Sequence, residues 1–480
     1  MNTIPTIGME THVELNTDSK MFCSCKVEYS SNPNQYLCPT CLGLPGALPV
    51  PNKKAIEMIT LLSLSLGCTI TEKGMFHRKN YFYPDLPKNY QISQFDFPVG
   101  TEGALEIFSG GKLSDVEIER VHMEEDTGKS IHSGGRIDAA EYTLLDFNRS
   151  GVPLVEIVTK PVISNAKEAV AYIEELRQLV IDIGISHGKL ELGNLRFDAN
   201  ISVAKEGEKE LGVKVEIKNM NSLKSLERAI NYEIERQSSL LDNNELVIQE
   251  TRHWDEKVEK TISMRTKEGS EDYRYFSDPD IPNMYLDKNF IIRVEELLSE
   301  LPKDRRSRYV DLGLSLEESN HIVKSEEWVR SLFEELLVNT SSIRSAYLWS
   351  TGELLGQLRK LEIESKPDHL NGENLGELIT LVEEGKISSS AGKEVLSMLI
   401  QGDLSPNEYA ISNRLIQESN EEEIEGLVSK VLDNNPEIVE RIRSGEDKLI
   451  SYLVGEVMKQ SSSSLNPGIV KEIIANKTIE

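Results

Sequence analysis

The chain has 480 residues, and its 80 acidic and 53 basic side chains give it a net charge of −27 at pH 7. That length corresponds to about three domains, with ample sequence for a buried core. The negative charge excludes a protein that binds nucleic acids nonspecifically through a positive field, although a nucleic acid could still dock on a local basic patch.

The first residues indicate a compartment and a first strand. The start MNTIPTIGMETH lacks the basic and apolar segments of a signal peptide, and five cysteines is an odd number for a disulfide framework. We therefore expect a cytoplasmic protein. Residues 6–15 alternate with a period of two, so Glu10 and His12 are predicted on one face of a strand, with Met9 and Val13 on the other.

The cysteines come next in the chain. A Cys-x-Cys pair and a Cys-x-x-Cys pair, separated by twelve residues, are formed by Cys23, Cys25, Cys38 and Cys41. Two such pairs on a loop can surround one ion tetrahedrally, which predicts a structural Zn²⁺ site. The alternative is a redox Cys-x-x-Cys, which the absence of a surrounding βαβ pattern disfavours. The apolar segment 55–70, interrupted by Glu57 and too short to cross a bilayer, is predicted as a buried helix with Cys68 in the core.

The segment VHMEEDTGKS, residues 121–130, contains Gly-Lys-Ser without a nucleotide-binding loop. A P-loop needs a glycine five residues before Gly128, and Met123 stands there. What remains is a run of hard ligands that could hold Mg²⁺, namely His122, Glu124, Glu125 and Asp126. The alternative is an acidic turn that simply faces water.

Further strands and two helices follow before residue 290. Alternation in 151–161, 195–203 and 213–221 predicts strands, and it puts charge on one face of the last two: Arg196, Asp198, Asn200 and Ser202, then Lys214, Glu216 and Lys218. An antiparallel sheet with one wet side would look the same. The recurrence of carboxylates with a histidine and an asparagine favours a site. Helical periodicity spans 164–184, with Ser164 as N-cap and Gly184 at the end, and 222–241.

From about residue 290 onward the chain changes character, because short helical pieces with Asp, Ser and Asn breaks replace the strands. We expect one all-helical module there and a second one from residue 407. The stretch QSSSSLNPG at 460–468 is predicted as a loop between two helices. The sequence therefore predicts an α+β protein with a mixed or antiparallel sheet, followed by two helical domains.

Several long strings resemble one family. They are GMETHVEL, CPTCLGLPGALPV, HRKNYFYPDLPKNYQISQ, HMEEDTGKS, DFNRSGVPLVEIVTKP, DANISV, VEIKNMNS, QETRHWDE and MRTKEGSEDYRYFSDPDIP. In this order they are similar to the GatB family of the aspartyl/glutamyl-tRNA amidotransferases, over essentially the whole chain. The resemblance implies a cradle-shaped catalytic domain of glutamine synthetase-like type at 1–292, a helical domain at 293–406, and a C-terminal helical tail domain at 407–480 that contacts tRNA.

The resemblance also implies a reaction and partners. Glutamate on mischarged Glu-tRNA(Gln), or aspartate on Asp-tRNA(Asn), is activated by ATP as an acyl phosphate and then amidated with ammonia. An amidase subunit (GatA) releases that ammonia from glutamine, and a small stabilising subunit (GatC) completes a heterotrimer. The implied enzyme is a carbon–nitrogen ligase with glutamine as amido-nitrogen donor. Its cofactors are ATP, Mg²⁺ and structural Zn²⁺, and its nucleic-acid partner is the mischarged tRNA(Gln) or tRNA(Asn).

The chemistry of phosphoryl transfer agrees with the residue types present. It needs Mg²⁺ between phosphate oxygens and cations that offset the developing charge. We expect catalytic roles for His12, Glu125, Glu10, Glu216, Glu191 and Asp198. Of these, the expected Mg²⁺ ligands are Glu10, His12, Glu125, Glu191 and Glu216. The expected ATP-binding residues are Arg78, Lys79, Tyr81, Tyr83, Lys88, Arg149, Ser150 and Lys218.

Two features qualify the resemblance. The chain has no Ser-Ser-Lys amidase signature, since SSSS at 461–464 lacks flanking glycines and a preceding strand, so ammonia has to come from another chain. Ser463 stands where the family's tail has glycine, which leaves the tail's contact with tRNA open. The rival hypothesis is a non-catalytic, zinc-stabilised tRNA-binding scaffold. Convergence of Glu10, His12, Glu125 and Glu216 on one metal would favour the enzyme.

Overall fold

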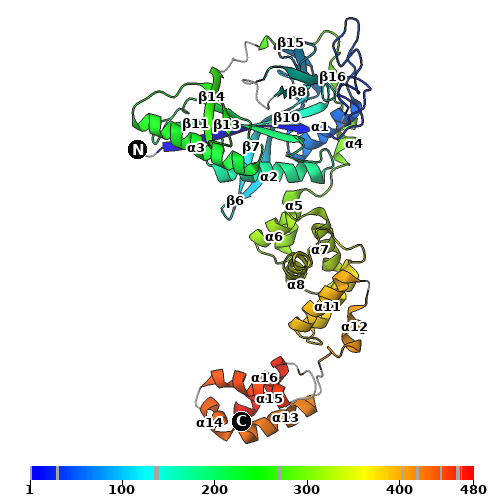
Figure 1. Ribbon diagram of the computed structural model, residues 1–480, viewed down its shortest axis with the longest axis vertical. Helices are drawn as coiled ribbons and strands as arrows, with labels where there is room; N and C mark the ends of the chain where they lie inside the picture. Colours follow the sequence, from blue (N-terminus) through cyan, green and yellow to red (C-terminus); the bar gives the residue numbers. More distant parts are fainter. Residues whose placement is uncertain are drawn as a thin grey trace. The chain divides into compact units, whose positions relative to one another are not determined.

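The computed structural model describes residues 3–28, 32–133, 140–266, 273–402, 404–417, 421–443, 446–460, 465 and 467–479. The chain forms two compact units, Met1–Arg305 and Arg306–Glu480. The first unit combines a large sheet with helices and the second is helical (Figure 1). The predicted α+β class is therefore confirmed at the level of a mixed sheet accompanied by many helices.

A nine-stranded mixed sheet forms the centre of the first unit. Its order is β14-β13-β12-β11-β1-β10-β7-β6-β2, and the only parallel pair among the described strands is β12 with β13. The strands are β1 (Thr3–Glu14), β2 (Thr69–Ile70), β6 (Gly100–Ser109), β7 (Lys112–Glu125), β10 (Pro153–Thr159), β11 (Leu195–Lys205), β12 (Val215–Lys218), β13 (Glu250–Asp255) and β14 (Lys260–Thr266).

Helices cover one face of this sheet. They are α1 (Lys53–Ser65), α2 (Ala166–Asp182) and α3 (Leu223–Asp242), and α2 and α3 run along the sheet beneath β7 and β11 (Figure 1). The apolar side chains of the strands and of these helices share one core, in which Met9, Phe197 and Ile217 are buried. The predicted alternation is thereby confirmed, because the charged side chains of the same strands lie on the opposite face.

The ends of the helices follow local capping chemistry. Asn52 and Ser222 cap α1 and α3 by accepting hydrogen bonds from main-chain amides of the first turn. The predicted N-cap of α2, Ser164, is wrong by one residue: Asn165 accepts from Glu168 N, while Ser164 donates through its N and Oγ to the Glu168 carboxylate. The helix ends before Gly184, whose φ of +72° favours glycine.

Smaller sheets and one helix complete the first unit. Strands β4 (His77–Asn80), β5 (Tyr90–Ser93) and β15 (Phe276–Ser277) form one sheet. Strand β3 (Lys73–Gly74) pairs with β16 (Met284–Tyr285), and β8 (Lys129–His132) pairs with β9 (Thr143–Asp146). Helix α4 (Lys288–Glu295) contacts α1. Figure 1 shows β8, β15 and β16 on the side of the large sheet opposite α2 and α3.

The second unit contains short helices around two separate apolar cores, one from Tyr309 to Ala410 and one from Ile424 to Ile474. Its elements are α5 (Pro302–Asp311), which begins in the first unit, α6 (Leu316–Val323), α7 (Glu327–Asn339), α8 (Ile343–Tyr347), the π-helix η4 (Leu348–Leu354), α9 (Leu355–Lys360), α10 (Gly372–Glu383), α11 (Ser389–Gln401), α12 (Pro406–Ser412), α13 (Glu421–Asn434), α14 (Pro436–Arg443), the 3₁₀ turn η5 (Asp447–Leu449), α15 (Ile450–Gln460) and α16 (Pro467–Ile479). The domain boundaries at residues 292 and 406 stay predictions. Ser463 lies outside the described residues.

Among the helices that the structure describes, none combines the length and the apolar composition that crossing a bilayer requires.

Candidate active site and four-cysteine cluster

A cavity of about 1500 Å³ opens on the charged face of the large sheet. Its floor is made by side chains that five neighbouring strands, β12, β11, β1, β10 and β7, turn to the same side. These floor residues are Glu10, His12, His122, Glu124, Glu156, Arg196, Asp198, Glu216 and Lys218. Strands far apart in the sequence therefore bring carboxylates, imidazoles and cations into one concave surface.

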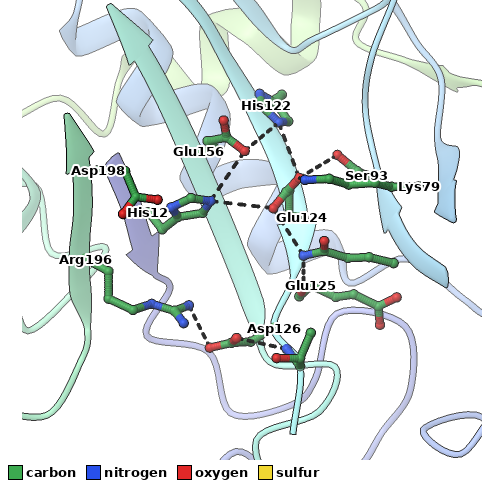
Figure 2. A network of polar contacts seen from close by, with 12 residues as sticks. His12, Lys79, Ser93, His122, Glu124, Glu125, Asp126, Glu156, Arg196 and Asp198 are labelled. Atoms are coloured by element: carbon green, nitrogen blue, oxygen red, sulfur yellow. Dashed lines mark hydrogen bonds and ion pairs between the residues drawn. The ribbon is translucent and has the colours of Figure 1, made fainter. Parts of the chain in front are cut away.

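One group on this floor is a His–Glu cluster, made of His12, His122, Glu124 and Glu156. His12, Glu156 and His122 stand opposite one another on β1, β10 and β7. The Glu156 carboxylate lies 3.4 Å from His12 Nε2 and 3.3 Å from His122 Nε2. Glu124 lies 3.7 Å and 3.6 Å from the same two nitrogens (Figure 2). Mutual attraction of opposite charges holds this cluster together.

The electrostatics of the His–Glu cluster follow from burial and from the pairing of charges. Burial lowers the pKa of His122, but the charge of Glu156 and the hydrogen bond to Glu124 overcome this effect and raise the pKa to about 9. Burial raises the pKa of Glu124, but the charges of Lys79 and His122 bring it down to about 2. Burial lowers the pKa of His12, but the hydrogen bond and charge of Glu156 together with the charge of Glu124 raise it overall. The cluster is accordingly charged on both sides near neutral pH.

A second group, the three-carboxylate cluster, consists of Glu10, Asp198 and Glu216. These residues offer carboxylate oxygens that all lie within 4.8 Å of one another. Lys218 Nζ lies 2.6 Å from Asp198 and 3.2 Å from Glu216, so one ammonium pairs with two of the three carboxylates. Asn200 donates to Glu10 at 2.8 Å, while its buried Oδ1 has no hydrogen-bond partner among the described residues.

Hard oxygen donors and an excess of negative charge are what Mg²⁺ requires. The three-carboxylate cluster therefore fits a divalent cation better than the His–Glu cluster, whose carboxylates already face Lys79 and two imidazoles. For Lys218, burial lowers the pKa, but the charges of Asp198 and Glu216 raise it overall, so the side chain stays cationic.

Asp126, directly after β7, anchors a third part of the cavity. Arg196 donates to its carboxylate at 2.8 Å (Figure 2). Arg149 lies 3.5 Å from the same carboxylate. Arg149 also donates to the carbonyl oxygens of Thr127 and Gly128, at 3.1 Å and 2.8 Å. Two guanidinium groups thus line this end of the cavity, where they are able to bind an anionic ligand.

The structure brings most of the predicted site residues together. The predicted residues that line the cavity are Glu10, His12, Lys79, Tyr81, Arg149, Glu191, Asp198, Glu216 and Lys218. The predicted residues outside the lining are Arg78, Tyr83, Lys88, Glu125 and Ser150. This result describes their positions only, and their roles stay predictions.

The residues outside the lining have other partners or orientations. Because successive side chains alternate along β7, Glu125 points away from the face that carries Glu124. Its side chain is buried, forms an ion pair with Lys88 and accepts a hydrogen bond from Ile92 N at 2.9 Å. Arg78 donates to Asp278 and Asp280, at 2.8 Å and 2.9 Å. Tyr83 is 48% exposed, and Ser150 is buried.

The expected catalytic residues do not include several that line the cavity, and one of these, His122, was expected only as a possible Mg²⁺ ligand of the acidic segment 121–130. Glu156 and His122 face His12 across the sheet, and Tyr273 and Tyr275 line the cavity. A carboxylate in the apolar run LVEIV was the available signal for Glu156, since a buried charge needs a partner. For His122, the available signal was the alternation of side chains in 121–125, which puts His122 and Glu124 on one face of a strand and Glu125 on the other.

The four cysteines lie together, as predicted. The sulfur of Cys41 is 3.4 Å from that of Cys23 and 3.7 Å from that of Cys38, and all four sulfurs lie within 4.8 Å of one another. The hydrogen bond from Cys23 and the nearby charge of Lys20 lower the pKa of Cys41 to about 4. Four clustered thiols match the donor set of a closed structural zinc site. Cys68 is buried in the core, as expected.

Comparisons of the sequence with known proteins all give the same family. The sequence model of the GatB/GatE catalytic domain matches residues 5–292, and that of the GatB domain matches residues 331–478. The B subunit of the aspartyl/glutamyl-tRNA(Asn/Gln) amidotransferase of Persephonella marina is 44% identical over 98% of both chains. The protein of the same name from Clostridium novyi is 43% identical over 99% of both. The B subunit of the chloroplastic/mitochondrial glutamyl-tRNA(Gln) amidotransferase of Physcomitrium patens is 42% identical over 98% of this chain and 84% of its own.

Proposed function

This chain belongs to the GatB family, the B subunits of the tRNA-dependent amidotransferases, and from that premise we propose that its cavity activates a side-chain carboxylate on mischarged tRNA and delivers it to ammonia. The carboxylate belongs to glutamate on tRNA(Gln) or to aspartate on tRNA(Asn). Activation is needed because a carboxylate is a poor electrophile, whereas an acyl phosphate carries a leaving group that ammonia displaces.

The observation that carries this proposal is the composition and size of one cavity. Its volume of about 1500 Å³ exceeds the usual range of roughly 300–1000 Å³ for one small ligand, which allows for ATP together with an aminoacyl end of tRNA. Within it, the three-carboxylate cluster and several cations lie on the same floor. A scaffold that only bound tRNA would have no use for three converging carboxylates in a chain already strongly negative.

We assign Mg²⁺ to Glu10, Asp198 and Glu216, with His12, Glu124 and Glu156 as the neighbouring group that orients the substrate. Bound there, the ion supplies charge neutralisation for phosphate oxygens. Glu191 lines the same cavity and is the remaining acidic residue of the proposed set. Glu125 is better assigned to the support of the cavity wall than to the ion, because Lys88 already holds its carboxylate.

The basic and aromatic residues of the lining would bind the nucleotide. Arg149, Arg196 and Lys79 offer donors to phosphate oxygens from fixed positions on the wall and floor. Tyr81, Tyr273 and Tyr275 contribute aromatic surface near Lys79, whose ammonium lies 5.2 Å from the centre of the Tyr273 ring. These groups would orient ATP and exclude water from the transferring phosphoryl group.

The proposed reaction consists of two displacements. A side-chain carboxylate oxygen of the aminoacyl-tRNA attacks the γ-phosphorus of ATP, the bond to the bridging oxygen breaks, and ADP leaves. Ammonia then attacks the acyl carbon, the carbon–oxygen bond breaks, and inorganic phosphate departs with the proton that nitrogen loses. We propose that the ammonia comes from glutamine through an amidase subunit (GatA), with a small stabilising subunit (GatC), and that the complex works in the cytoplasm.

The proposal is tested with the reconstituted complex by measuring amide formation and ADP release. Glu10→Gln and Glu216→Gln each remove a charged ligand, so both rates fall on the order of 100-fold while tRNA affinity at fixed salt stays the same. The matched control is Glu117→Gln, an exposed carboxylate on β7 that pairs with Lys160 outside the cavity. Wild-type ADP release and amidation in both cavity variants would favour the scaffold hypothesis.

A further inference from the structure

Lys20 is a fully buried lysine whose ammonium reaches the four-cysteine cluster. It donates to Tyr36 O at 2.9 Å, to Phe147 O at 3.4 Å and to the sulfur of Cys41 at 3.6 Å. An ammonium has three donors, and here all three have partners. Two of these partners belong to the cysteine loop, residues 32–44. The third belongs to residues 145–151, which include the end of β9 and the turn after it and are called here the wall loop.

Other hydrogen bonds join the same two loops. Asn34 accepts from Phe147 N at 2.8 Å and donates to Leu145 O at 2.9 Å. Asn148 accepts from Tyr36 N at 2.9 Å and donates to Asn32 O at 2.8 Å. Because the side-chain amides of Asn34 and Asn148 both donate and accept between the two loops, they fix the position of one loop relative to the other.

The wall loop carries part of the cavity lining. Asn148 and Arg149 line the cavity, and Arg149 approaches Asp126. The end of the wall loop packs on Lys20. At Gly151, whose φ is +86°, a Cβ atom added to the glycine would lie 3.5 Å from Lys20 Cδ. Lys20 thus contacts both a cysteine sulfur and the main chain of the wall loop, and this main chain positions the guanidinium of Arg149 in the cavity.

We propose that Lys20 is a positioning residue, through which metal held by the four cysteines orders the cavity wall that carries Asn148 and Arg149. A divalent ion with four thiolates carries excess negative charge, and a buried ammonium offsets it while it also binds two carbonyl oxygens. A neutral side chain at residue 20 would leave a thiolate and both carbonyls without this donor. The inference rests on the proposed function only in treating this cavity as the active site.

Hydrogen exchange of the full-length protein tests the coupling without ATP or tRNA. The metal is removed with a zinc chelator at constant magnesium, and exchange is followed in peptides that cover residues 145–152. In the wild type, exchange there rises about tenfold on zinc removal. In Lys20→Met, exchange is already fast and responds little to zinc. The helix α2 serves as internal reference, since its amides report on global unfolding.

Cobalt binding gives a second readout, because thiolate-to-cobalt absorption reports the cluster directly. Lys20→Met weakens Co²⁺ binding by about 10–100-fold. The matched control is Lys26→Met, which changes a lysine of the same region that is 65% exposed and pairs with Glu28, and it leaves both readouts unchanged.

Asn34→Gly tests the coupling between the metal site and the wall loop separately from the affinity of the cysteines for metal. This variant remains informative if Lys20→Met fails to fold. Glycine tolerates the φ of 57° at this residue, and the substitution removes one of the side chains that join the two loops. It keeps Co²⁺ affinity and loses the zinc response of residues 145–152. Exchange at 145–152 that ignores zinc in the wild type would overturn the proposal. So would a Lys20→Met protein with wild-type Co²⁺ affinity and zinc response. Neither outcome touches the phosphoryl-transfer proposal, which depends on the carboxylates.

Discussion

Glu124 and Glu125 are adjacent residues of β7 with separate surroundings. Glu124 lies on the cavity floor beside His12, His122 and Lys79. Glu125 lies behind the wall with Lys88. Because strand geometry alone separates them, substitution of the two residues by glutamine should produce two different defects.

We predict that Glu125→Gln lowers stability rather than removing a metal ligand. The change leaves the buried Lys88 ammonium without its counter-charge, which costs about 3–5 kcal/mol. Adding Lys88→Met should restore much of the stability, because neither residue of this buried pair is then charged. Urea unfolding of the two variants measures this; equal instability of the single and double variants would contradict it.

Glu124→Gln, in contrast, should lower activity in protein that still folds, because Glu156 remains as a partner of both imidazoles. The carboxylate faces two imidazoles and Lys79, so its loss changes the charge of the cavity floor, and we expect amide formation to fall by about 10–100-fold. Steady-state amidation beside a thermal unfolding curve measures both effects. A variant that is unfolded at the assay temperature, or fully active, would show that this assignment of Glu124 is mistaken.

At the scale of elements, α3 is joined to the edge of the sheet by one buried carboxylate. Glu233 accepts from Gln237 and Arg236 on its own helix, at 2.9 Å and 2.6 Å. It also accepts from Thr261 on β14 at 3.0 Å, and it lies 3.8 Å from Arg252 on β13. A single side chain thus connects a helix to the two last strands of the sheet.

Glu233→Gln should therefore loosen β13 and β14 more than the centre of the sheet. Removing the buried charge leaves Arg236 and Arg252 underpaired, at a cost of about 3–5 kcal/mol. Hydrogen exchange should rise in β13 and β14 and stay slow in β1. Glu235→Gln, an exposed change on the same helix, is the control. Uniform loss of protection across the sheet would contradict this localised role.

Local patterns predicted several elements and one face of the site. Alternation in 6–15 and 195–203 put Glu10 and Asp198 on the polar face, because period two belongs to the strand itself. The pairing of His12 with Glu156 depends on β10 lying beside β1, and strand order is a property of the whole topology. The same reason hides the pairing of Lys88 with Glu125, since these residues meet only when β5 contacts β7.

At the scale of the whole molecule, the first unit contains both the cavity and the four-cysteine cluster. Zinc removal from the full chain should lower the unfolding temperature of this unit, because a closed thiolate site contributes folding free energy. Calorimetry before and after chelation, with zinc added back, measures the effect. An unchanged unfolding temperature in protein shown to have lost zinc would contradict a structural role.

The source of nitrogen is a second property of the whole molecule. The sequence contains no amidase signature, so the chain without its partners should be inactive with glutamine and active with ammonia at high concentration. Amide formation on mischarged tRNA with each donor measures this. Glutaminase activity in the purified single chain would contradict it.

The most direct test of the central claim is the fate of a side-chain oxygen. Mischarged tRNA carrying glutamate with ¹⁸O in its side-chain carboxylate is amidated by the complete complex, and the inorganic phosphate is analysed by mass spectrometry. Activation as an acyl phosphate transfers one labelled oxygen to phosphate for each amide formed. Amide formation with unlabelled phosphate would show that the carboxylate is never phosphorylated, and it would contradict the account.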